Sequence, residues 1–111
     1  MYTLVTSEAF KHSLERLYAF MSKKYGEDVA RKHKKSLRNN IVSRLTANPY
    51  IAPVSDRLLS LGISEYRQWN IDEHNILYFK INEERKQIEL LAVMDSRQSI
   101  QKLLFEIMLL L

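Results

Sequence analysis

Two arginines occupy positions that are unusual for a solvated arginine. Arg67 lies among aromatic residues in an apolar run, and Arg97 follows the end of another apolar run, two residues after Asp95. A guanidinium on a covered sheet needs an anionic or carbonyl partner, and its paired N–H groups fit a phosphate or a carboxylate. Both arginines are therefore candidate contacts for such a group. Internal pairing is the alternative, in which Arg67 bonds Glu65 or Glu89. Arg97 would likewise bond Asp95.

Five basic residues within eight positions form the densest charged run of the chain. They are Arg31, Lys32, Lys34, Lys35 and Arg38. In a helix, at about 100° per residue, all of them except Lys32 project within an arc of about 100°, opposite Leu37 and Ile41. Such a stripe can bind phosphates or an acidic partner, or it can be a solvated helix face.

The sequence offers little support for metal or cofactor chemistry. His12, His33 and His74 fall in three different predicted elements, without an Asp or Glu in metal-ligand spacing on one helix face. Gly26 and Gly62 stand alone, so there is no glycine-rich phosphate loop. We expect no metal and no cofactor.

The composition predicts a small folded domain. The chain has 111 residues, of which 46% are apolar, with two Gly and two Pro, and this length fits a single domain over residues 1–111. The absence of cysteine excludes a disulfide framework, a thiolate zinc site and a cysteine nucleophile. No run reaches the roughly 20 apolar residues that cross a bilayer, and no basic stretch precedes an apolar one at the N-terminus. We expect a cytoplasmic protein without membrane contact.

The net charge of +4 is unevenly distributed. Residues 1–56 carry ten basic and five acidic side chains, whereas residues 57–111 carry seven and eight. The positive charge therefore belongs to the half that contains the basic run.

The first half is predicted to contain one strand and two helices. Residues 2–6 are rich in β-branched and aromatic types, which favours a strand. Ser7 can cap a helix whose apolar residues recur at three- and four-residue steps, and Gly26 can end it. A second helix follows and stops before Pro49, because proline disfavours helix in the preceding residue. The two helices form an antiparallel hairpin, followed by an irregular connector to Gly62.

The second half is predicted to be mostly sheet. Residues 65–71, 75–81 and 87–94 form three strands of an antiparallel meander, and residues 100–111 have helical spacing again. The predicted fold is α+β with the order β-α-α-β-β-β-α, in which the helical hairpin packs on an antiparallel sheet.

The order of these elements, together with several stretches of sequence, resembles the RelE/ParE superfamily of type II toxin–antitoxin toxins. The stretches are LGISEYRQ at 61–68, ILYF at 76–79, ELLAVMDSR at 89–97, YG at 25–26 and LTANP at 45–49. The resemblance covers nearly the whole chain. It implies a small toxin, of a kind associated with plasmid stabilization, that a cognate antitoxin neutralises in a hetero-oligomer. The antitoxin's C-terminal segment would wrap the toxin, and its N-terminal domain would bind operator DNA.

The superfamily has two branches with different targets. RelE-like members cleave mRNA in the ribosomal A site with arginines, lysines and often a His or Tyr near the C-terminus, whereas ParE-like members poison DNA gyrase. Arg67 and Arg97 match arginine positions of the nuclease, but no Tyr or His follows Arg97, and Arg57 is the sole basic residue in the loop before Arg67. Arginine moves protons poorly because its pKa stays above about 12. The resemblance therefore favours a gyrase inhibitor without catalysis of its own, with a ribosome-dependent mRNA endoribonuclease as the alternative. A third possibility is a relative that lacks toxicity and is kept for its antitoxin pairing.

Under each of these interpretations, we expect the antitoxin to bind an apolar groove beside the helical hairpin and the sheet edge. The expected target or partner contacts are Arg67, Arg97, Arg31, Lys34, Lys35 and Arg38. The leucine-rich C-terminal helix either packs on the chain's own sheet or contacts the partner.

Overall fold

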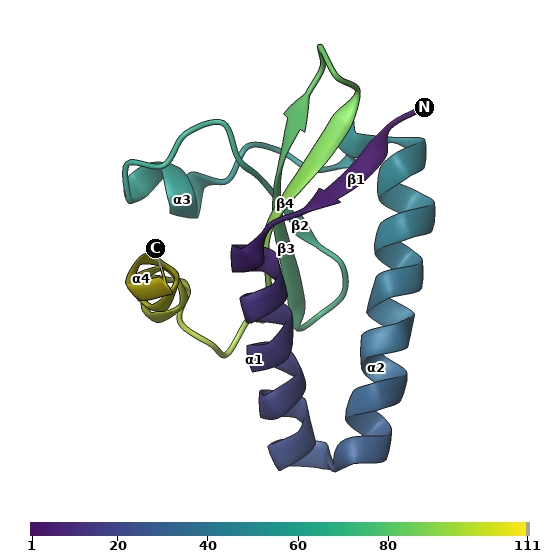
Figure 1. Cartoon of the computed structure of the whole chain (residues 1–111), viewed down its shortest axis with the longest axis vertical. Helices are drawn as coiled ribbons and strands as arrows, with labels where there is room; N and C mark the ends of the chain where they lie inside the picture. Colours follow the sequence, from purple (N-terminus) through teal and green to yellow (C-terminus); the bar gives the residue numbers. More distant parts are fainter. Residues whose placement is uncertain (111) are drawn as a thin grey trace.

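A four-stranded sheet separates two layers of helices in the computed structural model, which describes residues 1–110 (Figure 1). Leu111, the last residue of the predicted C-terminal helix, lies outside the described residues. The elements are β1 (Thr3–Thr6), α1 (Glu8–Tyr25), α2 (Glu27–Asn40), the π-helical turn η1 (Ile41–Leu45), the 3₁₀ turn η2 (Pro49–Ile51), α3 (Asp56–Ser60), β2 (Arg67–Asn70), β3 (Asn75–Asn82), β4 (Gln87–Asp95) and α4 (Ile100–Leu110). The predicted α+β class and the order of the seven expected elements are confirmed.

The strand order of the sheet is β1-β4-β3-β2. Strands β2, β3 and β4 form the predicted antiparallel meander, with Arg67 opposite Phe79 and Asn75 opposite Asp95. Strand β1 pairs with β4 in parallel, a placement that the sequence pattern did not specify. Parallel neighbours need a long connection, and all the elements from α1 to β3 lie between these two strands.

Two serines, one at the N-cap of α1 and one within it, bond backbone groups of β4. Ser7 caps α1 by accepting the N–H of Phe10 at 3.0 Å, and its hydroxyl donates to the carbonyl of Leu90 at 3.2 Å. Ser13 is buried, accepts the N–H of Val93 at 3.0 Å and donates to the carbonyl of Phe10 at 2.7 Å. These bonds fix α1 on the sheet.

Each face of the sheet has its own hydrophobic core. The α1–α2 hairpin covers one face, where the fully buried side chains include Leu17, Leu37, Leu45, Leu77, Phe79 and Ile88. Helices α3 and α4 cover the other face, where Leu58 of α3 and Ile100 and Leu103 of α4 pack on the strand residues Tyr78, Ala92 and Met94 (Figure 1). The C-terminal helix thus packs on the chain's own sheet, although Phe105, Met108 and Leu109 remain exposed on its outer side.

The connector contains a helix that the sequence pattern did not predict. Helix α3 begins after Ser55, whose hydroxyl accepts the N–H of Leu58 at 3.2 Å. The Ser-Asp pair at its start is a helix-start signal that could have been recognised.

The second helix also differs from its prediction as one regular helix. Helix α2 gives way to η1, and the hydroxyls of Ser43 and Thr46 donate to the carbonyls of Asn39 and Val42. Such side-chain bonds to the preceding turn compete with regular helical bonding.

Candidate functional site

Arg97 lies in the turn between β4 and α4, and its guanidinium forms two hydrogen bonds to the carboxylate of Asp95. Nε donates to Oδ1 and Nη2 donates to Oδ2, each at 2.7 Å. The Asp95 side chain is 1% exposed, whereas that of Arg97 is 34% exposed. The guanidinium also donates to the hydroxyl of Tyr25 at 3.3 Å and lies 5.4 Å from the ring centroid of Phe20. The internal pairing of Arg97 is confirmed.

This pair is charged across the physiological range. Burial raises the pKa of Asp95, but the hydrogen bonds and positive charge of Arg97 outweigh it and hold that pKa below its usual value. The bonds to Asp95 and Tyr25 in turn raise the pKa of Arg97. The Nε and Nη2 edge of the Arg97 guanidinium is therefore occupied by hydrogen bonds to Asp95.

A hollow beside Arg97 collects groups that can move protons. It is lined by Met21, Tyr25, Val29, His33, His74, Asn75, Asp95 and Arg97. Asn75 is buried and donates to both carboxylate oxygens of Asp72 at 2.8 Å, so that its own Oδ1 is left without a partner among residues 1–110. The Nε2 atom of His33 is also unpartnered within that part of the chain. The fold thus brings two histidines and a tyrosine to the hollow beside Arg97 from positions that precede it in the sequence, where the pattern of residues after Arg97 gives no signal for them.

Arg67 is held by a carbonyl and an aromatic ring. Its Nη1 donates to the carbonyl of Ala52 at 2.6 Å, and its Cζ lies 4.9 Å from the ring centroid of Tyr50. The predicted pairing with Glu65 or Glu89 is wrong: no ion pair to Arg67 occurs among the described residues. The strand register explains this.

Arg67 lies opposite Phe79, whereas Glu89 lies opposite Lys80. Side chains alternate between the two faces of a sheet, so Arg67 and Glu89 lie on opposite faces. Glu65 precedes β2 with a φ of +73°, outside the strand.

The ring beneath Arg67 is fixed by a cluster at the β3–β4 turn. The hydroxyls of Tyr50 and Tyr2 donate to the two carboxylate oxygens of Glu83, at 2.5 Å and 2.6 Å, and Lys86 lies 3.1 Å from Oε1. Hydrogen bonds from Tyr2, Tyr50 and Lys86 hold the pKa of Glu83 at about 2. The bond to Glu83 raises the pKa of Tyr2, and it raises that of Tyr50 to about 12.

The structure places Arg67 and Arg97 apart. Arg67 is opposite Phe79, and Arg97 lies two residues beyond Asp95, which is opposite Asn75. Four residues of β3 separate the two levels, or about 13 Å along the sheet. Each guanidinium is also held at its own position, Arg67 by the carbonyl of Ala52 and Arg97 by Asp95, so the two do not converge on one site in this structure.

An apolar groove lies between the hairpin and the β1–β4 edge of the sheet. Its volume is about 410 Å³, and it is lined by Leu4, Thr6, Phe10, Leu14, Leu37, Ile41, Val42, Leu90 and Val93, with Lys11, Lys34 and Arg38. The expected groove beside the hairpin is present.

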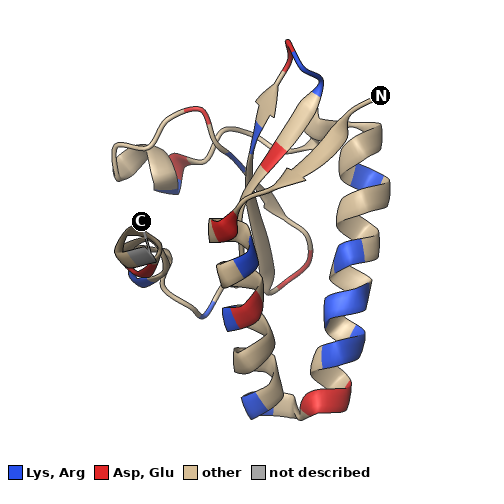
Figure 2. Ribbon diagram, viewed as in Figure 1, with Lys and Arg blue, Asp and Glu red and all other residues tan. Residues whose placement is uncertain are grey.

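The basic run lies along α2, and its members have different surroundings (Figure 2). Lys34 and Arg38 line the groove together with Leu37 and Ile41, so the prediction that the stripe lies opposite these two apolar residues is wrong. The Nζ of Lys34 lies 5.5 Å from the ring centroid of Tyr18. Arg31 pairs with Asp28, and Lys35 is exposed. Only part of the stripe is therefore in position to meet an occupant of the groove.

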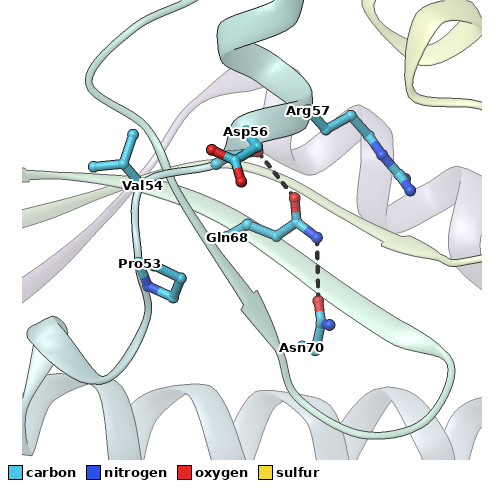
Figure 3. Close-up of a pocket in the computed structure, with 7 residues that line it drawn as sticks. Pro53, Val54, Asp56, Arg57, Gln68 and Asn70 are labelled. Carbon is cyan, nitrogen blue, oxygen red and sulfur yellow. Dashed lines mark hydrogen bonds between the residues drawn. The ribbon is translucent and has the colours of Figure 1, made fainter.

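Hydrogen bonds link several polar side chains that line an open hollow beside α3 (Figure 3). The hydroxyl of Ser55 donates to Gln68 at 2.9 Å, and the amide of Gln68 donates to Asn70 at 3.3 Å. These side chains largely satisfy one another.

Residues 1–110 contain no group of three His, Asp or Glu side chains placed to hold a metal ion. None of the helices described here is long and apolar enough to span a membrane.

No family model and no curated protein matches the sequence. Solved structures do match the fold. One is a chain of the crystal structure of the toxin–antitoxin complex RelBE2 from Mycobacterium tuberculosis, with a TM-score of 0.63 and 14% identity over 85% of this chain and 96% of that chain. Another belongs to the chromosomal ParDE TA system from P. aeruginosa, with a TM-score of 0.68 and 16% identity over 86% of this chain and 96% of that one. The chain has the RelE/ParE fold.

Within this RelE/ParE fold, sequence spacing could not reveal the cluster around Glu83. Tyr50 is 33 residues from Glu83, and Tyr2 is 81 residues from it. The parallel placement of β1 beside β4 brings Tyr2 to the β3–β4 turn. Because that placement was not predicted, the cluster was not predicted either.

Proposed function

We propose that this chain is the toxin of a type II toxin–antitoxin system and is held inactive by a partner antitoxin. The observation that carries the proposal is the fold, which matches chains of two toxin–antitoxin systems over 85% and 86% of this chain. The resemblance of residues 61–68 and 89–97 to the RelE/ParE superfamily supports it further.

The antitoxin binds the apolar groove between the hairpin and the β1 edge. The groove offers an apolar floor with Leu14 and Leu37, and its basic residues include Lys11, Lys34 and Arg38. Such a surface suits an amphipathic segment that places apolar side chains inward and carboxylates toward the basic residues. Strand β1 is the edge of the sheet, so an extended segment can also pair beside it.

We assign DNA gyrase as the target, bound without catalysis by the toxin itself. Two observations support this choice over a nuclease. One edge of Arg97 is filled by Asp95, and the strand level of Arg67 lies about 13 Å from that of Asp95. The two guanidinium groups, held by Ala52 and Asp95, are therefore not arranged around one reacting phosphate.

One observation favours the alternative, a ribosome-dependent mRNA endoribonuclease. The hollow beside Arg97 contains His33, His74 and Tyr25, which are side chains able to move protons. Mapping mRNA ends after expression separates the two targets. Cuts at ribosomal A sites would establish the nuclease, and their absence is expected for a gyrase inhibitor.

The toxin assignment itself is tested by expressing the chain alone and together with the protein encoded next to it. Expression alone should stop growth, and co-expression of the neighbouring protein should restore it. Unaffected growth during verified expression of folded protein would contradict the assignment and support a relative kept only for pairing.

A further inference from the structure

Two arginines on the hairpin side of β2 lie over aromatic rings. The Cζ of Arg67 is 4.9 Å from the ring centroid of Tyr50, and the Cζ of Arg44 is 5.3 Å from that of Trp69. Arg67 and Trp69 are two residues apart on β2, so they point to the same face with Cα atoms about 6.6 Å apart. Arg67 is therefore next to the residue whose ring carries Arg44.

Both arginines keep hydrogen-bond donors available. Among residues 1–110 neither pairs with an Asp or Glu, and Arg67 uses one donor, Nη1, for the carbonyl of Ala52. Arg44 has no side-chain hydrogen bond within that range, and it is exposed. A guanidinium stacked on a ring presents its N–H groups at its edge, and it is weakly hydrated, so it binds phosphate readily.

The surrounding structure holds this pair in place. The hydroxyl of Tyr50 is anchored on Glu83 at 2.5 Å, and the charge of Glu83 is offset by Lys86 at 3.1 Å. Arg44 belongs to the π-helical turn η1, which interrupts the regular path of α2. Short π-helical segments are found frequently at functional sites. Here the turn carries Arg44, which lies over Trp69 of β2 and does not belong to the basic run at residues 31–38.

We propose that Arg44 and Arg67, stacked on Trp69 and Tyr50, bind neighbouring phosphates of a nucleic acid strand. Arg67 and the ring beneath Arg44 belong to the same strand, so the two stacked guanidinium groups lie on one side of β2, and the guanidinium fork fits phosphate oxygens. The inference rests on the proposed function, since gyrase acts on DNA and the ribosome contains RNA. The inference adds that the toxin contacts the nucleic acid itself, through a surface separate from the antitoxin groove.

The test is fluorescence polarisation with the full chain and labelled single-stranded RNA, single-stranded DNA and duplex DNA of one sequence, over a range of salt concentrations. Each phosphate contact contributes about 0.7 to the slope of log K against log salt for a single strand and about 0.9 for a duplex. R44Q should lower the slope by about one such contact, and R44Q/R67Q by about two. The probe that binds most tightly shows whether the phosphates belong to RNA, single-stranded DNA or duplex DNA.

R44Q is the primary variant, because Arg44 has no internal side-chain hydrogen bond within residues 1–110 and its loss should not unfold the chain. K23Q/K102Q is the matched control, since it removes two exposed charges away from β2. The control should keep the slope of the natural chain. Poly-glutamate serves as an anionic polymer without phosphate. The inference is overturned if none of the nucleic acids binds, if poly-glutamate alone binds, or if R44Q/R67Q and the control K23Q/K102Q weaken binding equally. Binding is measured on purified protein, so this outcome is independent of whether the chain arrests growth.

Discussion

Asp95 and Arg97 are joined by two parallel hydrogen bonds of 2.7 Å across a turn with one residue between them. The backbone N–H of Arg97 adds a third bond to the same carboxylate, at 2.8 Å to Oδ1. This arrangement neutralises a buried carboxylate at the point where β4 leaves the sheet toward α4. It also explains why an arginine at a nuclease-like position can have a structural role.

Replacing Arg97 by alanine should destabilise the fold by about 2 kcal/mol, because Asp95 would stay buried without its ion pair. Urea unfolding followed by circular dichroism measures the loss. R85A, in the exposed β3–β4 turn, is the matched control and should change the free energy of unfolding by less than about 0.5 kcal/mol. Full stability of R97A combined with lost toxicity would contradict a structural role.

Replacing Ser13 by alanine should destabilise the fold by about 1–3 kcal/mol, since the N–H of Val93 would lose its buried acceptor. Hydrogen exchange should show faster exchange at Val93 than in the natural chain. S36A, on the exposed side of α2, provides the control and should leave that amide unchanged. Equal protection of Val93 in S13A would refute the proposed bond.

Replacing Val42 by glutamate should weaken antitoxin binding at least about tenfold, because a carboxylate would enter the apolar groove. Val42 is 47% exposed, so the substitution should leave the fold intact. V29E is a matched control on the same helical hairpin, since Val29 is 48% exposed and lies outside the groove. Calorimetric titration with the antitoxin measures both variants. Equal weakening by V29E would place the interface elsewhere.

The pH dependence of stability should reveal the cluster around Glu83. Its pKa is lowered from 4.5 to about 2 by hydrogen bonds from Tyr2, Tyr50 and Lys86. A lowered pKa means that the carboxylate stabilises the fold above about pH 4.5 and that this contribution disappears as the pH falls toward 2. E83Q should therefore lose less stability than the natural chain over that range. Chemical unfolding at several pH values tests this, and parallel curves for the two proteins would contradict it.

Local sequence patterns were sufficient to predict most helices and strands, but not the contacts between elements that are distant in sequence. Helix α1 followed from the spacing of its apolar residues between Ser7 and Gly26, and the three-strand meander followed from its alternating runs. The parallel partner of β1 depends on contacts between distant segments, and no local spacing encodes it. Helix α3 was missed because five residues are too few to show a period.

The candidate site shows the same division. The pairing of Arg97 with Asp95 was predictable because the two residues are neighbours in sequence. The stack of Arg67 on Tyr50 was not, since it joins η2 to β2 across an irregular connector. The approach of His33 and His74 to Arg97 likewise depends on how α2 and the β2–β3 turn meet the end of β4.

The most direct test of the account is the action of the purified chain on purified DNA gyrase with supercoiled plasmid. If gyrase is the target, the chain inhibits supercoiling and cleaved plasmid accumulates after denaturation of gyrase, and the antitoxin removes both effects. Untouched gyrase activity with protein that arrests growth in cells would contradict the assigned target.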